Sequence, residues 1–600
     1  MSRRKKSEPA YKRLIGYILV AFLVMLPWVS RLKIYELSER EGQYFSNQQG
    51  IYFDLFLYYK SVWIIFMMIV IVCFFLGEHI FPDHIISDIP LKEKQYRSTL
   101  WAVLVYIVGV LLSSVFSPYQ GEVVSGSPVE FEGTFVLIGY MVLFLAGINY
   151  FRSPKVKNAL KYGITIVAGI TVILSGIEFF GGYLFQFEFF KNLLAGDNYK
   201  AIIQSLQTGN FKNMITLTFF NSNYFGSFSV LIFPILAMYL IEAKIIWEKI
   251  GYAILTTGMI AAIVGSRSTA AFYLVLLQVI VILIYKRKEL LDRWKESLIY
   301  IGFFIGGICI INVTSQGKLL EMLQMSSSNT KYENTKQQRF ELTDLHMEGN
   351  KLTLIGTEKA FTLEYDQNEP SNRNKMKIYD EEEKKLKTTN SSDEQIQLQE
   401  TGYEPIKLVF STEGVSIDLG YESTLDFYMT EDGFYGVGQN GIALESVSRT
   451  SSIGKRYYSY FTGRGYAWMN SMPLLKQNLL IGKGPGTFLY QFQQYDYVGL
   501  LNTHGTTNLM IDKPHNMYLQ IALQTGGISL IAVLFLFVCY FMRGMKAFAV
   551  NQDLQGVFLG TISFMIIGMV NDSMVVVSPI FWMLLGIGYG SFQRTKDSIC

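Results

Sequence analysis

The chain has 600 residues and a formal net charge of +3; half of its residues are hydrophobic and only 17% are charged. Soluble proteins carry about a quarter charged residues, so this composition excludes an ordinary soluble enzyme. Apolar stretches of roughly 18 residues or more recur along the chain, which is the pattern of membrane-spanning helices. The basic residues lie between these stretches and form no groove for nucleic acid. We therefore expect an all-α polytopic membrane protein.

The first apolar stretch follows four basic residues, Arg3 to Lys6, and superficially resembles a signal peptide. No small-residue cleavage site follows and the stretch is long enough to span a bilayer, so we expect it to remain as a helix. About twelve spans are predicted in chain order, at residues 14–30, 61–81, 99–117, 134–151, 162–180, 223–241, 250–265, 269–285, 298–314, 516–540, 553–571 and 575–592.

The distribution of basic residues predicts the orientation of these spans. Cytoplasmic loops of membrane proteins are rich in Lys and Arg. In this chain every second short loop is rich in these residues. The predicted outer loops 118–133 and 572–574 contain neither residue, although the outer segments 31–60 and 181–222 hold a few. Both termini are therefore expected on the cytoplasmic side of the membrane, and the long loop 315–514 on the outer side.

The long loop divides the chain into four predicted parts. Residues 1–314 form a membrane domain with the first nine spans, and residues 516–600 complete it with the last three. Residues 315–450 are polar, with alternating stretches such as Lys351-Leu-Thr-Leu-Ile and turn signals such as Glu348-Gly349-Asn350, which predict a β-rich extracytoplasmic insertion. Residues 451–515 are aromatic and glycine-rich, and we expect them to pack on the membrane domain and carry active-site residues.

His515 lies where this polar loop passes into the apolar run that begins at Met517. Asp512 is a candidate N-cap and Pro514 suits the first turn of a helix. The positive end of the helix dipole favours an uncharged imidazole, which accepts a proton near pH 7. The pattern predicts a general base at the outer surface of the membrane; the alternative is a histidine hydrogen-bonded at the interface with no catalytic role.

Arg267 lies between two apolar runs on the side where arginine is rare. A charge near membrane depth costs about 2.5–3.5 kcal/mol on insertion scales, so it usually has a partner or a substrate. The guanidinium group binds phosphate bidentately, and an anionic lipid diphosphate would suit it. The alternative is an arginine at a hairpin tip in contact with water.

Arg464 lies four residues before Trp468, so on a helix the two would share a face and could form a cation–π pair. Such a pair could equally be structural. The glycines around Pro485 predict a tight turn, with a phosphate-binding role as the less favoured alternative. They lack the context of a nucleotide-binding loop.

Several outer-surface residues give weaker signals. Glu130 and Glu132 open the fourth span and could serve only as caps, and Asn221 and Asn223 open the sixth span in the same way. Asp572 lies in the last outer turn and is expected to be solvated.

Read together, these segments resemble the O-antigen ligase and O-antigen polymerase superfamily of bacterial membrane glycosyltransferases. The resemblance covers the membrane region and the end of the long loop, but not the polar insertion. Its motifs, in the expected order, are Glu130-Phe-Glu132-Gly133, Phe219-Phe220-Asn221-Ser222-Asn223, Ser266-Arg267-Ser268, Arg464-Gly-Tyr-Ala-Trp468, Gly482-Lys-Gly484-Pro-Gly486-Thr-Phe488, Lys513-Pro514-His515-Asn516, Gln524-Thr-Gly526-Gly527 and Pro579-Ile-Phe-Trp582. Members of the family often carry Glu where this chain has Gln524, so no carboxylate role is assigned there.

The resemblance implies a multi-helix, GT-C-like fold and an inverting, metal-independent transferase without cofactors. Its donor would be a glycan on polyprenyl diphosphate, such as undecaprenyl diphosphate, and its acceptor the hydroxyl of a saccharide or another molecule, for cell-envelope polysaccharide assembly. By carry-over, Arg267 and Arg464 would neutralise the diphosphate and His515 would deprotonate the acceptor. Expected substrate contacts come from Lys513, Asn516, Trp468, Glu132 and Asn223.

Ligation and polymerisation share this machinery, and the motifs do not separate them. The main alternative function is a transporter or flippase of lipid-linked oligosaccharide, which performs no chemistry. Such proteins tend to have internal repeats and midplane charges, neither of which this sequence shows. A carbohydrate receptor would explain the polar insertion but not Arg267 or His515. Partners other than the donor, the acceptor and the bilayer would be envelope-assembly proteins; no nucleic acid is expected.

Overall fold

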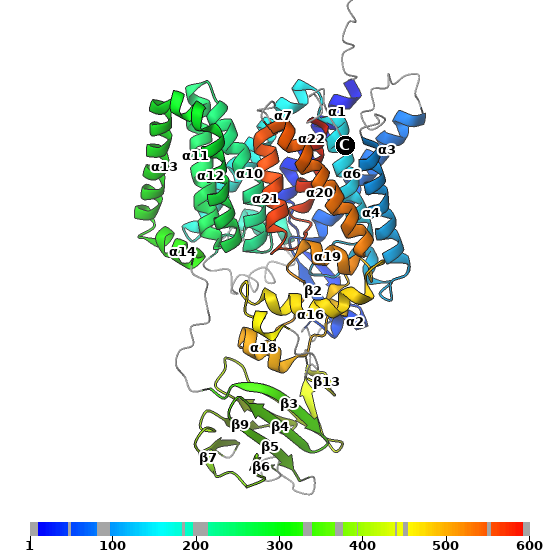
Figure 1. Ribbon diagram of the computed structural model, residues 1–600, viewed down its shortest axis with the longest axis vertical. Helices are drawn as coiled ribbons and strands as arrows, with labels where there is room; N and C mark the ends of the chain where they lie inside the picture. Colours follow the sequence, from blue (N-terminus) through cyan, green and yellow to red (C-terminus); the bar gives the residue numbers. More distant parts are fainter. Residues whose placement is uncertain are drawn as a thin grey trace, which may run out of the picture.

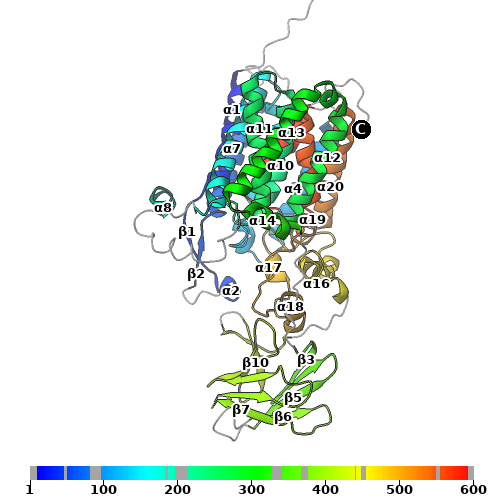
Figure 2. The same cartoon turned by 90° about the vertical axis from the view of Figure 1, so that its left-hand side faces the viewer.

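The computed structural model describes residues 10–45, 50–80, 96–182, 187–195, 214–327, 339–366, 376–392, 394–438, 441–447, 454–548 and 554–591. A helical bundle forms one end of the molecule and a β-rich lobe the other, with short helices between them (Figures 1 and 2). The first residues of the first helix and the last residues of the last helix both lie at the end of the bundle away from the lobe (Figure 1). This arrangement agrees with termini on one side and the long loop on the other.

Each predicted span coincides with a helix or a helix pair. The bundle helices are α1 (Ala10–Met25, continued by η1, Leu26–Trp28), α3 (Tyr58–Ile80), α4 (Arg97–Val115), α6 (Thr134–Tyr150), α7 (Pro154–Phe179), α10 (Ser222–Glu242), α11 (Ile246–Ser266), α12 (Thr269–Asp292), α13 (Trp294–Thr314), α19 (Met517–Gln524), α20 (Gly527–Phe548), α21 (Gln555–Ile567) and α22 (Ser578–Ser591). Nine helices within the described residues are long and apolar enough to cross a membrane. The expected total of twelve spans stays a prediction, because α6, α21 and α22 are shorter.

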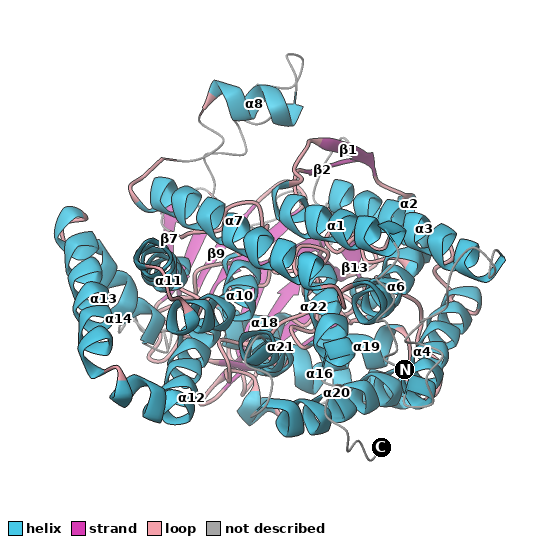
Figure 3. Cartoon of the chain, turned by 90° about the horizontal axis from the view of Figure 1, so that it is seen from above, coloured by secondary structure: helices cyan, strands magenta, loops and turns pink. Residues whose placement is uncertain are grey.

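The interior of the bundle is built on close helix contacts at glycine. Helix α22 packs against α6, where a Cβ atom on Gly586 would lie 2.1 Å from the carbonyl oxygen of Phe144. Helix α21 packs against α10, where a Cβ on Gly560 would lie 2.2 Å from the carbonyl oxygen of Leu231. Small residues allow such close approach in membranes, where packing rather than hydrophobic burial drives association. Seen from above, these four helices are surrounded by the others (Figure 3).

The predicted span 516–540 is not one helix. Helix α19 ends at Gln524 and α20 begins at Gly527, with Thr525 and Gly526 between them. Gly526 has φ +98°, a left-handed conformation that favours glycine. The sequence-based boundary was wrong here because hydropathy continues through the break.

The lobe is a sandwich of two antiparallel sheets. Within each sheet, strands that are consecutive in the chain are paired. One sheet contains β3 (Leu342–Glu348), β4 (Lys351–Gly356), β5 (Ala360–Tyr365) and β6 (Met376–Asp380). The other contains β7 (Thr388–Ser392), β8 (Gln395–Leu398), β9 (Lys407–Phe410), β10 (Gly414–Asp418), β11 (Leu425–Met429), β12 (Phe434–Val437) and β13 (Ala443–Leu444). Alternating apolar residues of both sheets, including Leu354 and Phe427, form one core. The β-rich insertion predicted from sequence is therefore present.

Residues 454–516, called the platform below, connect the lobe to the bundle. The platform contains η7 (Lys455–Tyr457), α16 (Arg464–Gln477), α17 (Phe488–Gln491) and α18 (Tyr497–His504). Helix α18 contributes Tyr497, Val498 and Leu501 to the lobe core, whereas Tyr466 of α16 shares a separate core with Leu519 of α19. The platform is thus packed on both neighbours.

Shorter elements complete the described structure. A hairpin of β1 (Lys33–Glu36) and β2 (Ile51–Asp54) follows η1, and α2 (Glu39–Gly42), α5 (Glu122–Ser125) and α8 (Glu188–Ala195) lie in segments that the charge pattern predicts to be outside. Helix α14 (Lys318–Ser327) lies at the start of the predicted polar lobe but packs against α11, α12 and α13, with Leu319 buried. The described part of the lobe begins only after it.

Candidate active site

His515 lies one residue before a helix cap rather than inside a first turn. The cap of α19 is Asn516, whose side-chain oxygen accepts hydrogen bonds from the backbone N–H groups of Tyr518 and Leu519, both at 3.0 Å. The expected cap, Asp512, instead pairs with Lys513, so that interpretation was wrong. His515 itself has φ +50°, an uncommon backbone conformation for a residue with a side chain. Strained conformations of this kind concentrate at functional sites.

Asp572 is the partner of His515. Its Oδ2 lies 3.0 Å from the His515 Nδ1, and its Oδ1 accepts a hydrogen bond from the backbone N–H of Asn516 at 3.1 Å. The hydroxyl of Tyr224, on α10, approaches Oδ2 at 3.4 Å. The Asp572 side chain is fully buried. The expectation of a solvated turn carboxylate was therefore wrong.

The direction of the hydrogen bond between His515 and Asp572 follows from the chemistry of the two groups. A carboxylate only accepts hydrogen bonds, so the hydrogen between the two groups belongs to the imidazole Nδ1. This leaves Nε2 as the acceptor nitrogen of a neutral ring. The His515 side chain is 39% exposed while its partner is buried, so the imidazole can reach a ligand that Asp572 cannot. This is the arrangement of a general base oriented by a carboxylate.

Arg464 reaches the same turn from the platform. It is the first residue of α16, after Gly463 with φ +86°. Its Nη2 donates to the side-chain oxygen of Asn571 at 3.4 Å, and its Nη1 donates to Thr462 Oγ1 at 3.0 Å. Within the described chain, its buried Nε–H has no hydrogen-bond partner. Burial lowers the pKa of Arg464, and the nearby Asp572 partly offsets this effect.

The expected cation–π pair between Arg464 and Trp468 is absent among the contacts of the described residues. Trp468 packs against Phe461 with ring centroids 5.1 Å apart, and its indole N–H donates to the carbonyl oxygen of Pro514 at 2.9 Å. That hydrogen bond joins α16 to the segment that carries His515. Trp468 therefore holds the two halves of the site together, which is a positioning role.

Among the described residues, Arg267 is connected to His515, Asp572 and Arg464 only through the contacts of the residue next to it, Ser268. It caps the C-terminus of α11 in the left-handed conformation, with φ +56°. The next residue, Ser268, donates to the Asn223 side chain at 3.1 Å, and the Asn223 carbonyl accepts from the Asn571 amide at 3.3 Å. Since Asn571 also accepts from Arg464, a chain of contacts connects both arginine-bearing segments. Arg267 has a buried Nε–H without a partner in the described structure, as Arg464 does.

Lys513 is a buried cation beneath the site. Its ammonium group lies 2.7 Å from the Asp512 carboxylate and 5.6 Å from the ring centre of Phe220. Burial disfavours the charged form, but Asp512 and Glu130 outweigh burial and raise the pKa of Lys513 overall. Lys513 therefore stays positively charged. Its expected contact with substrate stays a prediction; in the structure the side chain forms an internal ion pair with Asp512.

Glu130 and Glu132 are buried and do not cap α6, whose cap residue is Gly133. Glu130 accepts a hydrogen bond from the Gln524 amide at 3.0 Å, and Glu132 accepts from the Ser573 hydroxyl at 3.0 Å and from Tyr140. Burial raises the pKa of Glu130 to about 8 and that of Glu132 to about 7. The two carboxyl groups thus link the loop before α6 to α19 and to the turn that holds Asp572.

The glycines of the platform make backbone contacts with the α19–α20 break. The Gly484 N–H donates to the carbonyl oxygen of Gln524 at 2.8 Å, and a Cβ on Gly482 would lie 2.2 Å from the carbonyl carbon of the same residue. A Cβ on Gly526 would lie 2.3 Å from the carbonyl oxygen of Leu480, which is a similarly close approach. We call this contact the glycine clasp (residues 480–484 with 524–527). It confirms the tight turn and accounts for these glycines without a phosphate ligand.

Comparison with protein-family models and with curated proteins finds no match for this chain. Within the described residues, no group of three or more His, Cys, Asp or Glu side chains could hold a metal ion. His515, Asp572, Asn571 and Arg464 form a connected set of contacts at the junction of the platform and the bundle.

Proposed function

We propose that the chain is an O-antigen ligase- or polymerase-like membrane glycosyltransferase. It transfers a polyprenyl-diphosphate-linked saccharide to an acceptor hydroxyl at the outer face of the bacterial cytoplasmic membrane. The observation that carries the proposal is the His515–Asp572 pair, at 3.0 Å, connected through Asn571 to Arg464. An oriented imidazole beside a guanidinium suits proton removal next to a leaving phosphate.

The reaction is a single displacement at the anomeric carbon of the donor sugar. The acceptor O–H gives its proton to Nε2 of His515 while its oxygen forms the new bond to that carbon. The bond from the carbon to the diphosphate oxygen breaks, and the polyprenyl diphosphate leaves with the electron pair. Asp572 holds the Nδ1–H and stabilises the imidazolium that forms. Attack from the face opposite the leaving group inverts the configuration.

Arginine supplies the charge for the leaving group in this proposal, without a metal ion or cofactor. Arg464 and Arg267 each have a buried Nε–H without a protein partner in the described structure, and guanidinium groups bind phosphate oxygens in pairs. The lipid diphosphate carries the energy for transfer, because nucleotide sugars are absent outside the cell. A multi-helix, GT-C-like fold with twelve spans and cytoplasmic termini would place this site at the outer leaflet.

The proposal is tested in vesicles that contain the purified full-length protein, lipid-linked donor and acceptor glycan. His515→Ala should reduce transfer by about 10²–10⁴-fold, because this is the usual contribution of a general base and Nε2 is its acceptor. Asp572→Asn should reduce kcat by about a hundredfold or more through the wrong tautomer. His346→Ala, an exposed histidine of the lobe, is the matched control and should retain activity.

The arginine contribution is tested in the same vesicles with Arg464→Lys. An ammonium group cannot reproduce the paired donors, so transfer should fall while the protein folds normally. Arg339→Lys, on the lobe, is the control for the chemistry of the substitution. Undiminished product from both His515→Ala and Arg464→Lys would refute the catalytic roles proposed for these two residues. Loss of transbilayer lipid movement in these variants, with no product from the wild-type protein, would indicate a flippase instead.

A further inference from the structure

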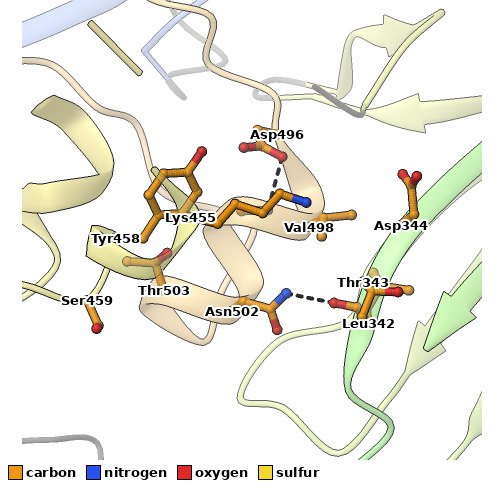
Figure 4. Close-up of a pocket in the computed structure, with 11 residues that line it drawn as sticks. Leu342, Thr343, Asp344, Lys455, Tyr458, Ser459, Asp496, Val498, Asn502 and Thr503 are labelled. Atoms are coloured by element: carbon orange, nitrogen blue, oxygen red, sulfur yellow. Dashed lines mark hydrogen bonds between the residues drawn. The ribbon is translucent and has the colours of Figure 1, made fainter. Parts of the chain in front are cut away.

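A cavity with both polar and apolar walls lies where the platform meets the lobe, away from the His515–Asp572 pair. It has a volume of about 290 Å³, close to the lower end of ligand-binding pockets. Its walls come from β3 of the lobe, from η7 and the residues that follow it, and from α18 (Figure 4). Nothing in the transfer chemistry above uses this cavity.

The walls of the cavity are held in fixed relation to one another. The Asn502 amide of α18 donates to the carbonyl oxygen of Leu342 on β3 at 2.7 Å, and its oxygen accepts from the Tyr421 hydroxyl of the lobe at 2.9 Å. Val498 and Leu501 of α18 lie in the lobe core. A cavity between elements tied in this way is formed before any ligand arrives, which reduces the entropic cost of binding.

The lining has the chemistry of a saccharide site. It combines the ammonium group of Lys455, the carboxylate of Asp344, the hydroxyls of Ser459 and Thr503, and the aromatic side chain of Tyr458. Figure 4 shows Lys455 extending from η7 in the direction of β3, which carries Asp344. Tyr458 is buried against Tyr466 and forms part of the wall, whereas the donors and acceptors of the other side chains suit the hydroxyl groups of a sugar.

Other ligand classes fit the cavity less well. Two carboxylates, Asp344 and Asp496, line it and would repel a phosphate group. The Asp496 carboxylate already accepts hydrogen bonds from the Gly499 N–H at 3.0 Å and from the Tyr466 hydroxyl at 3.1 Å. We therefore expect it to fix the wall of the cavity and not to bind the ligand. An apolar lipid chain would find no apolar counterpart in the Lys455, Asp344, Ser459 and Thr503 side chains that line the cavity.

The cavity adjoins the proposed transfer site through consecutive contacts. Thr503 lines the cavity, and the next residue, His504, packs against Gly463, where an added Cβ would lie 2.4 Å from the imidazole. Gly463 precedes Arg464. Burial lowers the pKa of His504, and the nearby His515 lowers it further, so the two imidazoles are electrostatic neighbours.

We infer that this cavity between β3, η7 and α18 is an acceptor-saccharide subsite, in which the lobe and the platform hold the acceptor glycan while its terminal hydroxyl reaches His515. The assignment to the acceptor rests on the proposed function; the assignment to a saccharide rests on the cavity itself. It gives the inserted lobe a role in acceptor selection.

The test measures binding apart from catalysis. The probe is the repeat-unit oligosaccharide released by mild acid from the surface polysaccharide of the native cells and labelled with a fluorophore at its reducing end. Fluorescence anisotropy is recorded with full-length His515→Ala protein in detergent, so that no turnover occurs. In that background Lys455→Ala and Ser459→Trp should each raise the Kd at least about tenfold. Arg456→Ala, an exposed cation beside Lys455 that does not line the cavity, should leave the Kd unchanged.

Equal Kd values in all variants, or no binding of the oligosaccharide to the His515→Ala protein, would overturn the inference. In the otherwise wild-type enzyme, Lys455→Ala should raise the KM for the acceptor and leave kcat unchanged, and a loss of kcat alone would also count against it. The two proposals fail separately. Cavity-dependent binding combined with full transfer by His515→Ala would refute the proposed chemistry and keep the saccharide site.

Discussion

Asp572 and His515 face each other although 57 residues separate them in the chain. The sequence predicts His515 well, because the junction between a polar loop and an apolar helix marks an exposed ionisable group. It does not predict Asp572, because a polar turn between two apolar segments usually lies in water. The missed signal is the run Asn571-Asp572-Ser573, in which each residue hydrogen-bonds another segment: Arg464, His515 and Glu132 respectively. Only tertiary packing brings these groups together.

Glu130 should make the stability of the protein depend on pH. Burial raises its pKa from 4.5 to about 8, so the folded state retains a proton that the unfolded chain has lost. Its contribution is fully present below pH 4.5 and is lost as pH rises through about 8, with a slope near 1.4 kcal/mol per pH unit for each proton. Glu132 acts in the same direction up to about pH 7. The melting temperature in detergent should therefore fall from pH 5 to pH 8.5.

Glu130→Gln removes the titrating group and keeps a side-chain oxygen that can still accept the hydrogen bond from the Gln524 amide. The fall in melting temperature should become clearly smaller in this variant, and the difference from the wild-type protein should accumulate from pH 5 to about pH 8. Glu413→Gln, an exposed glutamate of the lobe, is the control and should keep the wild-type slope. Identical slopes in all three proteins would show that Glu130 is ionised throughout.

At the scale of elements, the sequence predicts where helices lie better than where they break. All twelve expected spans coincide with helices or helix pairs, because apolar length and composition are local properties. The α19–α20 break depends instead on a distant segment, since the backbone of residues 480–484 occupies the space beside Gln524. The pair Gly526-Gly527 was the available signal, but glycine is common in membrane helices and does not by itself predict a break. The glycine clasp thereby sets the position of α19 and of the residues before it.

Gly482→Ala should disrupt the glycine clasp. The added Cβ would lie 2.2 Å from backbone atoms of Gln524, which cannot move as a flexible side chain could. Overpacking of this kind typically costs about 1–3 kcal/mol, and it should also displace α19 and reduce transfer. Gly176→Ala on α7 is the matched control, because an added Cβ there meets nothing within 4 Å and alanine favours a helix. Melting temperature and transfer rate should both fall for Gly482→Ala only; equal behaviour of the two variants would exclude the clasp as a structural determinant.

At the scale of the whole molecule there are three bodies: the bundle, the lobe at the other end and the platform between them (Figures 1 and 2). Hydropathy and charge predict the bundle and its division by one long loop. The β pattern predicts the lobe, and the aromatic, glycine-rich composition predicts that the platform packs on the bundle. The sequence does not predict that α18 joins the lobe core or that α14 stays with the bundle. Those assignments depend on which apolar faces meet, and a periodic pattern contains no such information.

The orientation of the three bodies in the membrane follows from the position of the basic loops. The α10–α11 connection, with Lys244, and the α12–α13 connection lie at the end of the bundle away from the lobe (Figure 1). Under the positive-inside rule we expect that end to be cytoplasmic and the lobe to lie outside. A polar lobe with this many charged groups cannot lie within the bilayer. It therefore lies either outside the membrane or on its cytoplasmic side.

Single cysteines at the two ends distinguish these outcomes. In a chain whose four native cysteines are replaced by alanine, Glu413→Cys places an exposed thiol in a turn of the lobe and Lys244→Cys one in the predicted cytoplasmic loop. A membrane-impermeant maleimide added to intact spheroplasts should label Glu413→Cys fully and Lys244→Cys only after the membrane is permeabilised. The reverse pattern would place His515 and Arg464 on the cytoplasmic side. A donor on the outer leaflet could not reach them there, and the proposed transfer reaction would be excluded by geometry alone.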